Sequence, residues 1–177
     1  LGRAMKELEE AGLSIALCNI DGGLADNAIP RQAEAAFLVT GYKGNGEETD
    51  ILEKVMEKLG EGLATEYGKK DPGVRLQTKL LDTEEKMALS EEDSRRLVNL
   101  ICMLPYGVQA MSSSMKGLVE TSLNPGVISL KQGQLHVGIS VRSSVDSAKQ
   151  GLFDRLSALA QLAGVEMEIT GNYPGFA

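Results

Sequence analysis

Hydrophobic and polar residues alternate strictly in two parts of this chain, and that spacing predicts strands with one buried and one solvent-facing side. The clearest alternation runs from Leu135 to Arg142. The Gln132-Gly133 pair before it predicts a tight turn back to an apolar strand over residues 127–130. More uniformly apolar runs predict further strands. The remaining predicted strands cover residues 15–20, 33–39 and 74–81, together with the alternating segment 165–169.

Three other segments repeat apolar residues every three or four positions, which predicts helices with one buried face. We expect Asp50 to cap the first of them and Ser90 to cap the second, where three carboxylates follow at the positive end of the helix dipole. Pro105 stops the second helix, and Gly164 is the expected C-terminal stop of the third. The three apolar stripes cover residues 51–63, 97–104 and 152–163.

The order of these elements repeats along the chain as strand, strand, helix, strand, with a helix between the two copies. This order predicts an α+β fold: a two-layer sandwich in which an antiparallel sheet carries helices on one face, built from two ferredoxin-like ββαβ halves. No stretch resembles a linker, so residues 1–177 are expected to form one domain. The fold hosts many unrelated functions, and function must therefore be argued from particular residues.

The charge balance of the chain limits the classes of partner that it can bind. Eighteen Lys and Arg against 25 Asp and Glu give a net charge of −7, without the basic cluster that neutralises nucleic-acid phosphates. No apolar run approaches the roughly 20 residues that span a membrane. Cys18 and Cys102 both lie in apolar surroundings, which favours buried reduced thiols over a disulfide and, with the rest, a cytoplasmic protein. We therefore expect neither nucleic acid nor membrane as a partner.

Catalytic constellations are scarce. His136 is the only histidine, so no histidine-rich metal site can form within the chain, and we interpret it as a half-exposed strand residue rather than a ligand. Adjacent carboxylates occur where solvated helix starts and strand faces would place them. Asn124-Pro125-Gly126 predicts a turn or a bulge. No catalytic residue is assigned within this chain.

Two residues point to ligand binding instead. Arg142 ends a strand on its polar side, where a guanidinium can hold a carboxylate with two hydrogen bonds; an ion pair with a nearby Glu is the alternative. Asn27 precedes Ile29-Pro30, and because Pro30 stiffens the return to the next strand, the Asn27 amide can donate to a substrate oxygen. A plain Asx-turn explains Asn27 equally well.

Several motifs of the chain match a known family. Asp26-Asn-Ala-Ile-Pro-Arg31 resembles a signature in the lid, or dimerisation, domain of di-zinc peptidases that include aminoacylases, carboxypeptidases and carnosine-type dipeptidases. Three longer stretches resemble the bacterial aminoacyl-histidine (Xaa-His) dipeptidase branch of this superfamily, and the resemblance runs over nearly the whole chain. These stretches are Gly117–Asn124, Val141–Ser147 and Gly171–Phe176.

The resemblance implies a larger enzyme whose catalytic domain holds two bridged zinc ions, with this chain as an inserted lid that binds no zinc itself. It implies that Asn27 contacts the substrate or its tetrahedral intermediate and that Arg142 binds the terminal carboxylate of a dipeptide. Tyr173 and Gly175 match a motif at the return to the catalytic domain and are implied to shape the substrate site. A first residue Leu1, rather than Met, also predicts a segment cut from a longer chain.

The sequence leaves two other functions open. One is an interaction module of the same fold that forms a homodimer and makes no substrate contact, although the lids of the family also dimerise. The other is a regulatory domain that binds a small ligand such as an amino acid. The partners expected on the lid hypothesis are a dipeptide, the catalytic domain of the same enzyme and a second copy of the lid.

Overall fold

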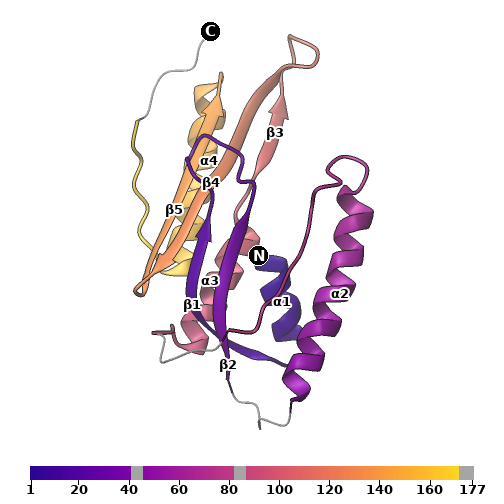
Figure 1. The fold of residues 1–177 in the computed structure, drawn as a ribbon. Helices are drawn as coiled ribbons and strands as arrows, with labels where there is room; N and C mark the ends of the chain where they lie inside the picture. Colours follow the sequence, from indigo (N-terminus) through magenta and orange to yellow (C-terminus); the bar gives the residue numbers. More distant parts are fainter. Residues whose placement is uncertain (41–45, 82–86, 172–177) are drawn as a thin grey trace.

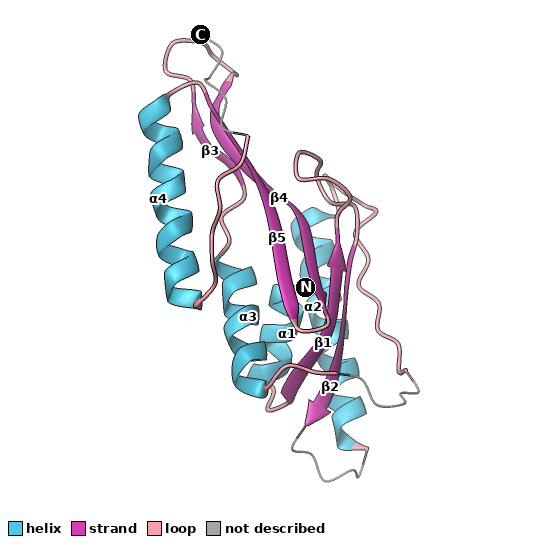
Figure 2. Ribbon diagram, turned by 90° about the vertical axis from the view of Figure 1, so that its left-hand side faces the viewer, coloured by secondary structure: helices cyan, strands magenta, loops and turns pink. Residues whose placement is uncertain are grey.

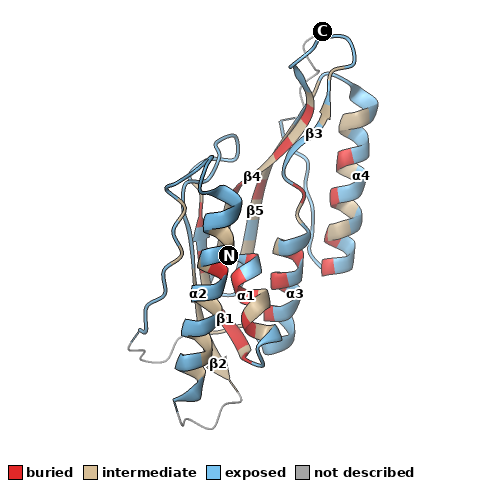
Figure 3. Ribbon diagram, turned by 90° about the vertical axis from the view of Figure 1, so that its right-hand side faces the viewer, coloured by how far each residue is buried: buried red, intermediate tan, exposed pale blue. Residues whose placement is uncertain are grey.

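A computed structural model describes residues 1–40, 46–81 and 87–171 of the chain. The described residues form an antiparallel sheet of five strands with four helices (Figure 1). Helices α1, α3 and α4 lie on one face of the sheet, and α2 stands beside α1 at the β2 end (Figure 3). In chain order the elements are α1 (Gly2–Glu10), β1 (Ser14–Gly22), β2 (Ala33–Thr40), α2 (Glu47–Tyr67), α3 (Glu91–Met103), β3 (Gly107–Met111), β4 (Val119–Lys131), β5 (Gln134–Ser143) and α4 (Asp146–Ala163).

Strand β4 organises the sheet. One of its edges pairs with β5 from Thr121 to Lys131, and its other edge is shared between β3 and β1. β3 pairs with residues 119–123 of β4, whereas β1 pairs only with residues 128–130. The predicted α+β class, with an antiparallel sheet and helices on one face, is confirmed.

The order helix, strand, strand, helix occurs twice, and the two copies meet at the centre of the molecule. α1, β1, β2 and α2 form the first half, while α3, β4, β5 and α4 form the second half, to which β3 adds a short strand. The halves join through β1 and β4, where Asp21 lies opposite Ser129, and through the packing of α1 against α3. The junction in the sheet is short, because only residues 20–22 of β1 take part in it.

Two predicted strands are wrong. Residues 74–81 and 165–169 are not paired strands in the structure. Residues 165–171 run along the outer edge of β5 without joining the sheet, as Figures 1 and 2 both show. Val165, Met167 and Ile169 remain 36%, 37% and 49% exposed. Their alternation therefore does not bury one face, and the fourth strand expected in each half is absent from the described residues.

The expected ends of the helices are mostly confirmed. Ser90 caps α3 by accepting a hydrogen bond from the backbone N–H of Asp93, and Gly164 ends α4 in the left-handed conformation with φ of 68°. The prediction that Asp50 caps α2 is wrong, because this helix begins at Glu47 after Gly46. The Glu47, Glu48 and Asp50 carboxylates instead lie in the first turn of α2, where the helix dipole favours negative charge.

The hydrophobic core has a larger and a smaller part. The larger part lies between the β1–β4 junction and the helices α1 and α3. The smaller part lies between α4 and the region of β4 and β5 where Leu123 pairs with Val141. Apolar residues of β5, among them Ile139 and Val141, point into this helical layer. Buried residues of the larger part are Met5, Ile15, Leu17, Ile20, Leu97, Val98, Leu100, Leu130 and Ala163; those of the smaller part are Leu123, Leu152 and Leu156.

One buried polar contact ties α3 to β1. Ser94 is 0% exposed, and its Oγ accepts a hydrogen bond of 2.8 Å from the backbone N–H of Leu17. Leu17 precedes an irregularity in the β1–β2 pairing. The serine hydroxyl therefore supplies a hydrogen-bond acceptor to a buried strand at a point where its ladder is interrupted.

Replacing Ser94 with alanine should lower the free energy of unfolding by about 1–3 kcal/mol, because the Leu17 N–H would stay buried without an acceptor. Urea unfolding followed by circular dichroism measures this loss. Ser147→Ala on the exposed start of α4 is the matched control and should change stability by less than about 0.5 kcal/mol. An unchanged urea midpoint for Ser94→Ala would contradict the role assigned to this contact.

Neither cysteine forms a disulfide, as expected, but their surroundings differ from the prediction. Cys18 is half-buried on β1, and Cys102, predicted to be buried, is exposed near the end of α3. Cys102 falls outside the apolar stripe because the buried face of α3 is formed by Leu97, Val98 and Leu100. No helix among the described residues is long and apolar enough to cross a membrane.

Candidate functional site

The strand β5 presents two different sides. Leu135, Ile139 and Val141 pack toward the helices, and because side chains alternate along a strand, the residues between them point to the opposite side. We call this side the helix-free face. On β5 it carries His136, Gly138, Ser140 and Arg142.

The loop between β1 and β2, residues 23–32, lies against this face; we call it the Asn27 loop. Its base is closed by the Gly23 N–H, which donates to the Gln32 carbonyl at 3.4 Å. Within it, the Ala28 N–H donates to the Ala25 carbonyl at 3.1 Å, forming a tight turn with Asp26 and Asn27 at its tip. The loop therefore has a defined conformation of its own.

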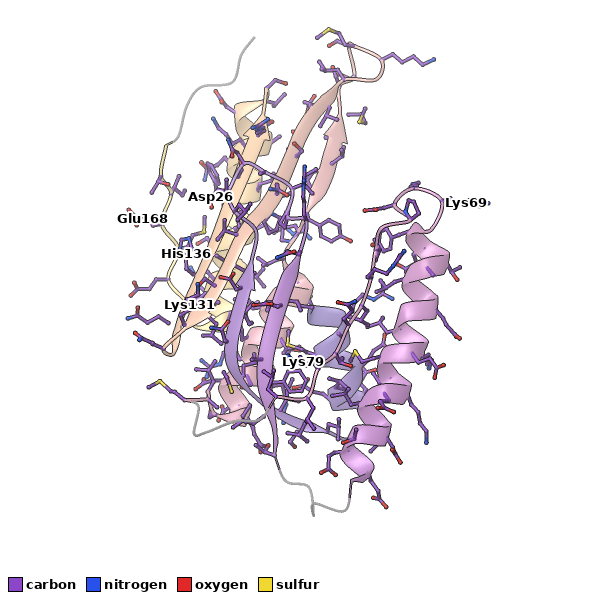
Figure 4. The ribbon with its side chains drawn as sticks, in the orientation of Figure 1. Asp26, Lys69, Lys79, Lys131, His136 and Glu168 are labelled. Atoms are coloured by element: carbon purple, nitrogen blue, oxygen red, sulfur yellow. The ribbon has the colours of Figure 1, made fainter. Side chains whose placement is uncertain are left out.

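Glycines of the second half allow this close approach. Gly126 and Gly138 are buried, and a Cβ atom on either would collide with the Asn27 loop. At Gly126 the collision would be with the Asp26 carbonyl, and at Gly138 with the Asp26 carboxylate. Figure 4 places Asp26 and His136 on the same side of the sheet. The loop of the first half thus rests directly on the backbone of β4 and β5.

A bulge in β4 lies at the same point. The β4–β5 register shifts between Pro125 and Val127, which leaves Gly126 as the extra residue. This confirms the turn or bulge predicted from Asn124-Pro125-Gly126. Gly23 closes the contact from the loop side, because a Cβ there would collide with the Gly126 carbonyl.

Asn27 is exposed at the tip of the loop. Its side chain makes no hydrogen bond with the described residues, so the Asx-turn alternative is not found and backbone groups hold the turn instead. The amide group therefore has its donors and its acceptor available for another molecule.

Arg142 is exposed near the end of β5 and forms no ion pair within the described part of the chain. The alternative of a structural ion pair with a Glu is therefore not found among these residues. The neighbouring Ser143 is occupied elsewhere, because its Oγ lies 2.8 Å from Thr121 Oγ1 and accepts from the Val145 N–H at 3.0 Å. The guanidinium is left as an available cation on a rigid strand.

The structure brings the two predicted residues to one face. Arg142 lies four residues along β5 from Gly138, which is about 13 Å of strand. Asn124 contacts the Asn27 loop and pairs with Ser140, which lies between Gly138 and Arg142 on β5. The Asn27 loop therefore extends from Gly138 in the direction of Arg142. Tyr173 and Gly175 lie outside the described residues.

The described residues do not fit a metal ion. Within residues 1–40, 46–81 and 87–171, no group of three or more His, Cys, Asp or Glu side chains is placed to hold one. His136 is exposed on β5, and Lys131 nearby forms an ion pair of 3.0 Å with Asp21.

The resemblance predicted from the sequence is confirmed by two related proteins. The crystal structure of aminoacylhistidine dipeptidase from Vibrio alginolyticus matches 99% of this chain with a TM-score of 0.87 and 30% sequence identity. The cytosol non-specific dipeptidase of Escherichia coli K12 is 34% identical over 166 residues, which is 93% of this chain. No protein-family model matches the chain.

The chain is therefore similar to one segment of a dipeptidase, because it spans only 33% and 35% of the lengths of the two relatives. More narrowly, its sequence and fold are both similar to those of the aminoacylhistidine dipeptidase from Vibrio alginolyticus.

Asn124, Gly126 and Gly138 belong to this site but were not predicted as part of it. The sequence indicated an irregular strand around Asn124 and a polar position at Gly138. That they meet the Asn27 loop depends on the register of β4 against β5 and on the path of a loop almost a hundred residues earlier. No local pattern carries that information.

Proposed function

We propose that this chain is the lid of a zinc-dependent dipeptidase that hydrolyses Xaa-His type dipeptides in the cytoplasm. The relatives named above are dipeptidases, and the chain corresponds to about one third of each. In this proposal the lid positions the substrate and closes over a di-zinc site formed by flanking sequence. Alone, the chain would be inactive, because its described residues offer no metal site.

One observation carries the proposal: Asn27 and Arg142 reach the same face of the sheet, and neither has a side-chain partner among the described residues. The Asn27 amide would donate to the substrate carbonyl oxygen and to the oxyanion that it becomes. The Arg142 guanidinium would hold the terminal carboxylate in a bidentate pair. Together they would orient a dipeptide by its reacting bond and by its end.

Exposed apolar residues on the Asn27 loop support the closing motion. Leu24 is fully exposed at 101% and Ile29 is 83% exposed, on either side of Asn27. Exposed apolar side chains that gather on one surface often mark a contact with another protein or domain. We propose that the catalytic domain of the same enzyme covers them when the lid closes.

Replacing Asn27 with alanine in the full-length dipeptidase should lower kcat for an Xaa-His dipeptide by about tenfold to a hundredfold, since one hydrogen bond to a charged intermediate is lost. Zinc content, measured by elemental analysis, should stay at the wild-type value. Asn99→Ala on the exposed side of α3 is the matched control and should leave turnover unchanged. Near-normal kinetics for Asn27→Ala would refute the substrate-positioning role.

Self-association is a second candidate role, and β3 favours it. β3 pairs only with β4, so among the described residues its outer edge is open. Val108 and Met111 on this strand are 54% and 51% exposed, and the adjacent Tyr106 is 73% exposed. An open edge with apolar side chains can pair with a second copy. If assembly were the only role, Asn27→Ala would leave the kinetics intact.

A further inference from the structure

We infer that Asn124 is a positioning residue that fixes the orientation of Asn27, an inference that rests on the function proposed above. The Asn124 Nδ2 atom donates to two backbone carbonyls, Asp26 O at 3.2 Å and Ala28 O at 2.8 Å. These carbonyls belong to the residues immediately before and after Asn27. One side chain therefore holds the backbone on both sides of the substrate-facing residue.

The amide of Asn124 suits this task in both length and chemistry. An amide nitrogen carries two hydrogens, so it can satisfy two carbonyls at once, whereas a hydroxyl has one donor and a carboxylate has none. Asn124 is half-buried on β4, opposite Ser140 of β5, so its backbone is held by the sheet. The donor group is thus carried by a rigid element.

The glycine contacts give this arrangement a second, independent support. Gly126 lies two residues after Asn124, and it faces the carbonyls of Ala25 and Asp26 where a Cβ would collide. Gly138 leaves space for the Asp26 carboxylate in the same way. These glycines let the loop approach β4, and Asn124 then selects one position of the turn by binding both of its carbonyls.

The turn also leaves Asn27 little freedom of its own. The Ala28 N–H is used within the loop by the Ala25 carbonyl, and the Asp26 and Ala28 carbonyls are used by Asn124. The side chain of Asn27 has no partner among the described residues. Asn124 therefore acts on the reaction through the direction of the Asn27 amide and does not touch the substrate itself.

The inference predicts that Asn124→Asp lowers kcat for an alanyl-histidine dipeptide about tenfold in the full-length enzyme, with KM nearly unchanged. The aspartate is nearly the same size but offers no donor and repels the two carbonyls. Asn124→Ser, which adds no charge, should show the same pattern. Asn124→Gln keeps the amide on a longer stem and should restore part of kcat.

A double-mutant cycle with Asn27→Ala separates positioning from general damage to the fold. If Asn124 acts only through Asn27, the double variant Asn27→Ala/Asn124→Asp should be no slower than Asn27→Ala alone. Amide hydrogen exchange gives a readout besides activity, because the Ala28 N–H should exchange faster in Asn124→Asp. Asn99→Asp on α3 is the matched control and should change neither measurement.

The outcomes are distinct. Multiplying losses in the double variant, or unchanged exchange at Ala28, would overturn the inference. Normal turnover by Asn124→Asp alongside impaired Asn27→Ala would overturn the inference and leave the proposed function standing. Normal turnover by Asn27→Ala itself would overturn both.

Discussion

Replacing Arg142 with alanine in the full-length dipeptidase is expected to lower kcat/KM for Xaa-His dipeptides by about a hundredfold to a thousandfold. The reason is that a carboxylate held by two charge-assisted hydrogen bonds would lose its partner inside a closed site, which costs about 2–5 kcal/mol. Arg142 is available for this contact because it has no ion-pair partner among the described residues. Steady-state kinetics measure the effect, most of which should appear in KM.

A substrate without the terminal charge tests the assigned contact directly. With a dipeptide amide, which lacks the terminal carboxylate, the wild-type enzyme should be slow and Arg142→Ala should slow it no further. Arg142→Lys should recover only part of the activity, since lysine lacks the planar fork of donors. Arg155→Ala on the exposed side of α4 is the control for loss of one positive charge. Equal losses with both substrates would show that Arg142 does not bind the carboxylate.

Gly23→Ala is expected to lower kcat/KM by about a hundredfold, and to lower stability as well. Gly23 has φ of 76°, which disfavours alanine, and its Cβ would collide with the backbone carbonyl of Gly126. Since the carbonyl belongs to a strand, the Asn27 loop must move away from β4. A displacement of about 1 Å in a substrate-positioning group can cost a hundredfold in rate.

The chain offers a control that separates backbone strain from collision. Gly117 also has a positive φ, of 85°, but a Cβ there would meet no described atom within 4 Å. Gly117→Ala should therefore lose about 1 kcal/mol of stability while keeping normal turnover. The two variants are compared by thermal unfolding and by kinetics at a temperature where both are folded. If Gly23→Ala kept wild-type turnover, the loop would not depend on its contact with Gly126.

Patterns within single elements predicted the fold well where burial of one face decides the structure. The alternation in β5, the Ser90 cap and the Gly164 stop all reflect local chemistry and are confirmed. β3 was not predicted, because its five residues GVQAM show neither the alternation of a strand nor the spacing of a helix clearly. All of them but Ala110 are exposed. The segment 165–169 has the period of a strand, but a strand also needs a paired edge.

The candidate site, too, could be predicted from the sequence only in part. Asn27 and Arg142 could be chosen from the sequence because a segment stiffened by proline follows Asn27 and a predicted strand ends at Arg142. Their placement on one face, and the contact of the Asn27 loop with Asn124, Gly126 and Gly138, could not. Those contacts join residues almost a hundred positions apart, and they follow from strand register and from a bulge.

On the proposed function, the packing of the Asn27 loop against β4 and β5 would also affect the entropy of substrate binding. A free ten-residue loop would have to be ordered when the dipeptide arrives, at a cost of about 1 kcal/mol or more for each residue fixed. Here Asn124 and the glycines order the loop of one half against the other half as the chain folds. On the proposed function, the affinity for the dipeptide would therefore not be reduced by the cost of ordering the loop that carries Asn27.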